Sequence, residues 1–214
     1  MMRTDPVLIT VNRRLSRWLQ KSHGEQQLRL GQQAWSTPTI LPYTTWLEQS
    51  WELLWDQPDI LAHHQPVLLL NEHQERLLWQ QIIAATVTLE EQPLFRAAAA
   101  VHDVMGGWRL LCEADLELTE SMVMGHEDAM VFYGWQQQFR QRCQQQRWID
   151  QGGLAQWLCQ HADLVPWPSA LTWVGFDQLT PIQQALIERL RQIGVKVTLS
   201  EAPDNAATDQ TCWS

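Results

Sequence analysis

Lysine is nearly absent from this chain of 214 residues: Lys21 and Lys196 are the only two, and arginine supplies the other positive charges. With 15 basic and 24 acidic residues, the formal net charge is −9. Non-specific binding to nucleic acid depends on Lys and Arg neutralising phosphates. An acidic chain is therefore a poor DNA binder by itself. Any contact with DNA would have to be local or come from another part of a larger protein.

The chain also lacks paired cysteines, a signal peptide and long apolar runs. Its four cysteines are scattered without a CxxC pair: Cys112, Cys143, Cys159 and Cys212. No apolar run approaches the roughly 18 residues of a membrane-spanning helix, and no charged segment followed by an apolar one opens the chain. These absences predict a soluble, cytoplasmic protein with reduced thiols and no membrane contact.

Metal ligands are sparse as well. The histidines and the one Cys-x-His pair are dispersed (His63, His64, His73, Cys159 and His161), whereas a zinc site needs three or four converging ligands. Asp177 could hold a metal with help from Gln178, but one carboxylate makes a weak magnesium site, and an Asp here is more typical of a turn or cap. We expect no metal and no cofactor.

A phosphate-binding loop is missing at the position where a first strand would lead into one. Residues 7–11 form a buried-strand candidate, Asn12 is expected to cap a helix, and apolar residues then recur at helical spacing. A loop of the form GxxxxGK[ST] needs glycines, so that backbone amides converge on phosphate, and a Lys that reaches the terminal phosphates. Residues 10–15 contain neither, so the sequence predicts no ATP binding in the usual manner.

A second strand and capped helix lie near the C-terminal end. Residues 171–176 have the composition of a strand covered on both faces, and Thr180 and Gln183 form a capping box around a proline at the first helical position. In open α/β sheets, chemistry gathers just beyond the carboxyl ends of such strands. A helicase-type hydrolase would place an Asp and a Glu there. This chain has Gly175 and Phe176, which indicates the scaffold of a motor without its chemistry.

Strand patterns cluster at both ends of the chain, and helical patterns fill the centre. Residues 39–41 and 195–199 are the other strand candidates, the latter after Gly194, which stands where a helix C-terminus favours a left-handed residue. This alternation predicts an α/β fold with a parallel sheet that a helical insertion interrupts. We expect helices that begin near Thr44 or Thr45, at Asn71 and at Pro93, helices over 127–146 and 150–158, a loop over 56–66 and a Met-rich acidic connection over 113–125.

Thirteen tryptophans are an unusual number for this length. Tryptophan at helical spacing belongs more often to a core than to a ligand platform. We therefore expect most of them to be buried.

The order of these segments resembles the N-terminal, helicase-like region of helicase-nuclease subunits of the AddB and RecC type. More closely, it resembles a bacterial family of probable DNA repair proteins that join such a region to a C-terminal PD-(D/E)XK nuclease. The resemblance covers nearly all 214 residues. It is carried by residues 8–15 (LITVNRRL) in the first-motif position, 39–47 (TILPYTTWL) in the place of helicase motif Ia, the helix start at Asn71 and Glu72, residues 132–150, and 173–181 (WVGFDQLTP), which resembles the family's "GF…LTP" form of motif II.

When this segment is aligned with an active UvrD-type motif II, the Asp-Glu pair of that motif aligns with Gly175 and Phe176, and its downstream Gln aligns with Gln178. The resemblance implies a P-loop-NTPase-like sheet with a large helical insertion and a degenerate nucleotide site. Its domains would be a discontinuous helicase-like (RecA-like) domain at 1–57 and 164–200, a helical insertion subdomain at 58–163 and a polar linker at 201–214. It also implies a role in double-strand break processing and recombination, with DNA contacted through the full-length protein. The implied partners are a helicase or nuclease subunit and C-terminal domains, including the nuclease, beyond Ser214.

Basic residues crowd the start of the first helix, next to Asn12. Arg13, Arg14 and Arg17 oppose the helix dipole there by a few tenths of a kcal/mol each. A contact with DNA, with another phosphate or with an acidic neighbouring domain would explain them. They could also form a solvated face on which Arg stems cover apolar surface.

Three functions fit these observations. The first is a catalytically silent scaffold or DNA-strand guide. The second is an atypical NTPase, against which the two missing motifs count. The third is a protein-interaction platform on Trp-rich helices without nucleic-acid contact, which would require an exposed apolar patch of several hundred Å².

Overall fold

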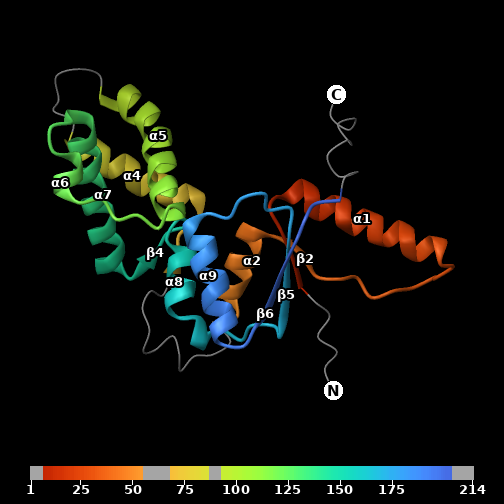
Figure 1. Ribbon diagram of the computed structural model, residues 1–214. Coiled ribbons are helices and arrows are strands. Elements are labelled where there is room, and N and C mark those ends of the chain that lie inside the picture. The colour runs from red at the N-terminus through yellow and green to blue at the C-terminus, as the bar shows by residue number, and fades with distance from the viewer. Residues whose placement is uncertain (1–6, 55–67, 87–92, 204–214) are drawn as a thin grey trace. The chain divides into compact units, whose positions relative to one another are not determined.

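The computed structural model describes residues 7–54, 68–86 and 93–203, without the side chains of 93–99 (Figure 1). The chain divides into two compact units. One, here called the sheet unit, comprises Met1–Asp56, His161–Leu179 and Gln184–Ser214. The other, here called the helical unit, comprises Gln57–Gln160 and Thr180–Gln183.

The sheet unit contains a four-stranded parallel sheet in the order β2-β1-β5-β6. The α/β class and the four predicted strands are confirmed, with ends that differ by one or two residues. Beyond Val174, Gly175 adopts φ +77° and the chain leaves the sheet earlier than predicted. The strands are β1 Val7–Thr10, β2 Ile40–Pro42, β5 Ala170–Val174 and β6 Lys196–Ser200.

Helices cover both faces of this sheet. In-register neighbours of parallel strands share a face, so Ile9, Trp173 and Leu199 lie together. The Trp46 ring of α2 (Tyr43–Glu52) lies 5.7 Å from the Trp173 ring on that face. Helix α1 (Arg13–Arg29) lies on the opposite side of the sheet from α2 and α9 (Pro181–Gln192), as Figure 1 shows. A 3-10 turn, η1 (Ala162–Leu164), precedes β5.

The strand order reverses between β1 and β5. Strand β1 continues through α1 to β2 on one side, and β5 continues through α9 to β6 on the other. In open α/β sheets, ligands bind in the crevice at the carboxyl ends of the strands at such a switch point. The carboxyl ends of β1 and β5 are therefore the place to look for a site.

Helix caps follow the predicted chemistry in most places. Asn12 Oδ1 accepts from the Leu15 amide at 2.9 Å, and Thr180 and Gln183 form a reciprocal capping box before α9. The predicted cap at Thr44 or Thr45 is wrong. Helix α2 begins at Tyr43 with Pro42 as N-cap, because the end of β2 leads directly into the helix.

The helical unit carries the predicted central helices, but it also contains a two-stranded parallel sheet that we did not predict. Leu68 and Leu69 pair with Trp148 and Ile149. Strands of two residues are too short to show a period of two, so no pattern marks them. The elements are β3 Leu68–Leu69, α4 Glu72–Thr86, α5 Pro93–Glu113, α6 Glu120–Val123, α7 Glu127–Gln146, β4 Trp148–Ile149 and α8 Leu154–Gln160.

The core of the helical unit is built on aromatic rings from α4, α5 and α7. Trp79 and Phe139 stack at 4.1 Å, and Trp108 packs at 5.8 Å from Phe139. Gly107 of α5 faces the Phe132 ring of α7, and a Cβ there would be in ordinary van der Waals contact with that ring at 3.4 Å. The prediction that most tryptophans are buried holds only in part. Among the described residues, Trp46, Trp51, Trp79, Trp108 and Trp173 are buried, five others are half-buried and Trp35 is exposed.

Some predictions concern parts of the chain outside the described residues. The loop expected over 56–66 and most of the linker expected over 201–214 fall there. In the described part of the chain, no helix has both the length and the apolar character needed to cross a membrane.

Candidate functional site at the carboxyl edge of the sheet

The junction of β1 and α1 leaves no room for a phosphate-binding loop. Only Val11 and Asn12 separate the last residue of β1 from the first residue of α1. Thr10 Oγ1 closes the turn by donating to the carbonyls of Asn12 at 2.9 Å and Leu41 at 3.3 Å. The Val11 amide donates to the Val174 carbonyl and the Leu15 amide donates to Asn12 Oδ1, so this segment forms a tight turn and a capped helix in place of a glycine-rich loop.

Across the switch point lies Gly175, the residue that the resemblance aligns with the first motif II carboxylate. Its φ is +77°, and a Cβ built on it would lie 2.5 Å from Leu15 Cδ2 and 3.5 Å from Val11 Cγ1. Leu15 is buried against this glycine. The crevice between the carboxyl ends of β1 and β5 is therefore filled by an apolar side chain of α1, and a carboxylate at position 175 would have to displace it.

Phe176, which the resemblance aligns with the second motif II carboxylate, belongs to an aromatic cluster on the other face of the sheet. Its ring lies 4.9 Å from Trp173 and 6.2 Å from Tyr43. Tyr43 in turn lies 5.3 Å from Trp173, and Trp46 lies 5.4 Å from Trp167. Position 176 thus contributes to packing between β5 and α2.

Arg13, Arg14 and Arg17 are all exposed, on the first two turns of α1. The first turn of α1 has no acidic residue. No ion pair reaches these three arginines from the residues that the structure describes. Their guanidinium groups are therefore available to an anionic ligand at the start of α1.

A cavity of about 570 Å³ opens beside the ends of β5 and β6. Asp177 lines it, as does Glu201, which sequence analysis missed. The register of β5 and β6 brings Asp177 and Glu201 to the same cavity, because Val174 pairs with Ser200 and the Gly175 amide donates to the Ser200 carbonyl at 3.0 Å. The other lining residues are Trp173, Phe176, Leu199, Ser200 and Ala202.

Two carboxylates in one cavity can attract a cation, but they do not form a metal site by themselves. Within the described residues, no group of three or more His, Cys, Asp or Glu is placed to hold a metal ion. His63 and His64 lie outside those residues. Gln178 is exposed and does not line the cavity that Asp177 lines.

The helical unit holds a second group of chemically notable residues, which sequence analysis also missed. Glu75 is fully buried, and neither of its carboxylate oxygens has a hydrogen-bond partner in the described part of the chain. Burial, followed by repulsion from Asp150, raises the pKa of Glu75 to about 7, although Arg109 and the Trp79 indole act in the opposite direction.

Asp150 is also buried, and its carboxylate, unlike that of Glu75, accepts hydrogen bonds. Trp108 Nε1 donates to its Oδ2 at 2.7 Å, and the Gly153 amide donates at 3.1 Å. Burial still raises the pKa of Asp150. A Cβ at Gly152 would lie within 3.2 Å of Asp150 Oδ2, Cys112 Sγ and Trp108 Nε1, so these three atoms converge on the glycine.

No protein-family model matches the chain, and no curated protein is significantly similar to it.

Proposed function

We propose that the sheet unit is a P-loop-NTPase-like fold with a closed nucleotide site. We further propose that the chain is the N-terminal, helicase-like and catalytically inactive module of a DNA repair helicase-nuclease. In this proposal it serves as a scaffold or strand guide during double-strand break end processing and recombination, and it has no catalysis of its own.

The filled crevice between β1 and β5 carries the inactive part of this proposal. Leu15 packs against Gly175 where phosphates would bind, and the turn at Asn12 is capped and short. The strand order is shared by several doubly wound folds. The helicase-like assignment therefore rests on motif positions, with residues 8–15 after β1 and 173–181 after β5.

The exposed arginines of α1 support the strand-guide part. A chain of net charge −9 needs a local cationic surface to approach DNA. Arg13, Arg14 and Arg17 form one at the carboxyl edge of the sheet, without carboxylate partners in the described residues. Partner subunits or C-terminal domains would supply the rest of the DNA affinity and the nuclease.

Fluorescence anisotropy with a labelled single-stranded oligonucleotide tests the DNA contact. We expect weak binding by this chain, worse than about 10 μM, that falls steeply with salt. Each phosphate contact contributes about 0.7 to the slope of log K on log salt for a single strand. The double variant Arg13→Ala, Arg14→Ala should flatten that slope by about 1 to 1.5.

The matched control is Lys21→Ala, Arg29→Ala, which removes the same charge from the same helix farther from the sheet edge. It should leave the slope within about 0.3 of the unchanged protein. Absence of binding at low salt, or equal effects of the two double variants, would refute the strand-guide role and leave the scaffold role.

A further inference from the structure

The start of α7 and the segment before it expose an unusual number of methionines. Met122, Met124 and Met130 are 57%, 69% and 39% exposed, and Val131 is 49% exposed. We call these four residues the methionine surface. Next to them a groove of about 540 Å³ is lined by Gly125, His126, Glu127, Met130 and Val131. Large apolar side chains gathered at a groove are typical of protein interaction sites.

The segment that carries this surface is strongly acidic. Residues 113–128 contain six carboxylates and neither Lys nor Arg. All six are exposed: Glu113, Asp115, Glu117, Glu120, Glu127 and Asp128. Glu120, Glu127 and Asp128 lie in first helical turns, where the helix dipole also favours negative charge.

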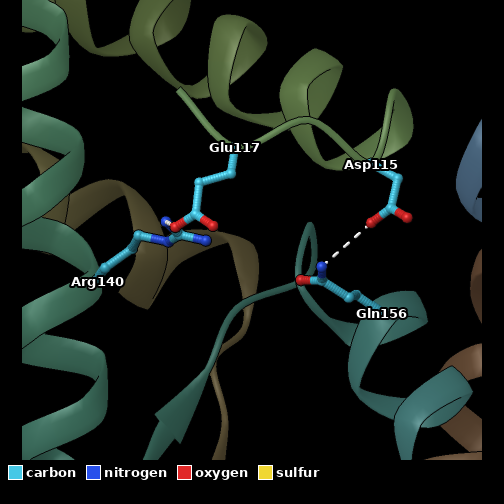
Figure 2. A network of polar contacts seen from close by, with 4 residues as sticks. All are labelled: Asp115, Glu117, Arg140 and Gln156. Atoms are coloured by element: carbon cyan, nitrogen blue, oxygen red, sulfur yellow. Dashed lines mark hydrogen bonds and ion pairs between the residues drawn. The ribbon is translucent and has the colours of Figure 1, made fainter. Parts of the chain in front are cut away.

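Polar contacts hold this acidic segment against the rest of the helical unit. Gln156 Nε2 of α8 donates to Asp115 Oδ1 at 3.1 Å, and Arg140 of α7 pairs with Glu117 at 2.5 Å, as Figure 2 shows. Val123 of α6 is buried. The methionines are therefore exposed on an anchored segment, so a partner would meet a largely preformed surface.

Charge decides what kind of partner fits. Glu117 is paired with Arg140, but the other carboxylates of this segment form no ion pair within the described residues, and they repel nucleic acid, anionic lipid and the same surface on a second copy of this chain. A partner with an apolar stripe flanked by Lys or Arg complements both the methionines and the acidic rim. Methionine side chains are unbranched and polarizable, so they adapt to apolar residues of differing shape.

We propose that the methionine surface and its groove bind a basic amphipathic helix of a partner protein. The apolar face of that helix would lie on Met122, Met124, Met130 and Val131, and its basic flanks would face the carboxylates around the groove. This mode combines helix-in-groove recognition with electrostatic complementarity. The inference does not depend on the DNA-related function proposed above.

The experiment uses the full chain and two fluorescent synthetic peptides of about 20 residues made of Leu and Lys. One has its Leu residues at helical spacing on one face. The other has the same composition in an order that forms no apolar face. We expect the amphipathic peptide to bind at least about tenfold more tightly at 150 mM salt, where weak charge attraction is screened.

Variants locate the site. Met122→Gln, Met124→Gln, Met130→Gln keeps the charge and should weaken binding of the amphipathic peptide by at least about tenfold. Leu28→Gln, Leu30→Gln is the matched control, because both leucines are more than 60% exposed on or just after α1. It should change binding by less than about twofold.

A charge variant separates the two parts of the recognition. Glu120→Gln, Glu127→Gln, Asp128→Asn should weaken binding several-fold and flatten its salt dependence. Circular dichroism checks that each variant folds; should the methionine variant unfold, the peptide comparison and the charge variant still decide. The proposal is overturned if the two peptides bind equally or if neither binds at about 100 μM. It is also overturned if the charge variant, or a folded methionine variant, binds the amphipathic peptide as tightly as the unchanged protein does.

Discussion

Gly175 has φ +77°, and an added Cβ would lie 2.5 Å from Leu15 Cδ2. A side chain here must tolerate a left-handed backbone and must also push Leu15 aside. Left-handed strain costs about 1–2 kcal/mol and overpacking about 1–3 kcal/mol. We predict that Gly175→Ala lowers the free energy of unfolding by about 2–5 kcal/mol in urea titration.

Two comparisons separate the strain from the steric conflict. Gly194 has φ +92° and no atom within 4 Å of a built Cβ, so Gly194→Ala should cost only about 1–2 kcal/mol. In a Leu15→Ala background, the cost of Gly175→Ala should fall to a similar value, because the conflicting methyl group is gone. Equal costs in both backgrounds would contradict the filled crevice.

Glu75 predicts a pH dependence of stability. Its folded-state pKa is raised from 4.5 to about 7, with burial as the main cause and Asp150 as the next. Between these values the folded protein keeps a proton that the unfolded chain has lost. The free energy of unfolding should therefore fall as pH rises from about 4.5 to 7, by up to about 3 kcal/mol from this group.

Urea unfolding of Glu75→Gln at pH 5 and pH 8 tests the sign and size of that effect. The variant should gain stability relative to the unchanged protein by about 2–3 kcal/mol on going from pH 5 to pH 8. Glu72→Gln is the control on the same helix, because Glu72 is exposed. Its relative stability should change by less than about 0.5 kcal/mol over that range. A Glu75→Gln difference that is the same at both pH values would show that Glu75 is ionised when buried.

At the scale of elements, the first turn of α1 depends on one cap. Asn12 Oδ1 accepts from the Leu15 amide, and the first turn that follows contains no acidic residue that could replace this cap. Asn12→Ala should cost about 1 kcal/mol in urea unfolding, whereas Asn12→Asp should be neutral or stabilising beside Arg13 and Arg14. A cost below about 0.2 kcal/mol for Asn12→Ala would mean that the cap does not stabilise the turn.

Elements with strong local patterns could be predicted from the sequence. The four strands of the sheet, the cap at Asn12 and the capping box at Thr180 and Gln183 were all predicted, because each depends on neighbouring residues. The same local reasoning gave a wrong start for α2, because Thr44 and Thr45 have the composition of N-caps but lie inside the first turn of the helix. Pro42 ends β2 and starts the helix in one step, so the hydroxyls are not needed.

Features that depend on distant contacts were missed. Glu201 joins Asp177 at the cavity through the register of β5 and β6, which no single segment reveals. Glu75 stands in a helix start with the composition of a solvated face, and only the packing of α4 shows that it is buried. The pairing of β3 with β4 joins segments about 80 residues apart in two-residue strands.

For the whole molecule, the distribution of charge matters more than its sum. The net charge of −9 disfavours nucleic acid as a general partner. The exposed arginines of α1 and the carboxylates of residues 113–128 nevertheless form two surfaces of opposite sign, each within its own unit. In the two proposals above, the first surface meets an anionic strand and the second meets a basic helix.

The central claim is that the nucleotide site at the carboxyl edge of the sheet is closed, and calorimetric titration of the chain with magnesium and ATP tests it most directly. We predict no saturable heat up to about 1 mM ATP, because Leu15 fills the crevice beside Gly175 and the two-residue turn at Asn12 is too short to form a glycine-rich loop around phosphate. Saturable binding with a Kd in the low micromolar range would contradict the claim.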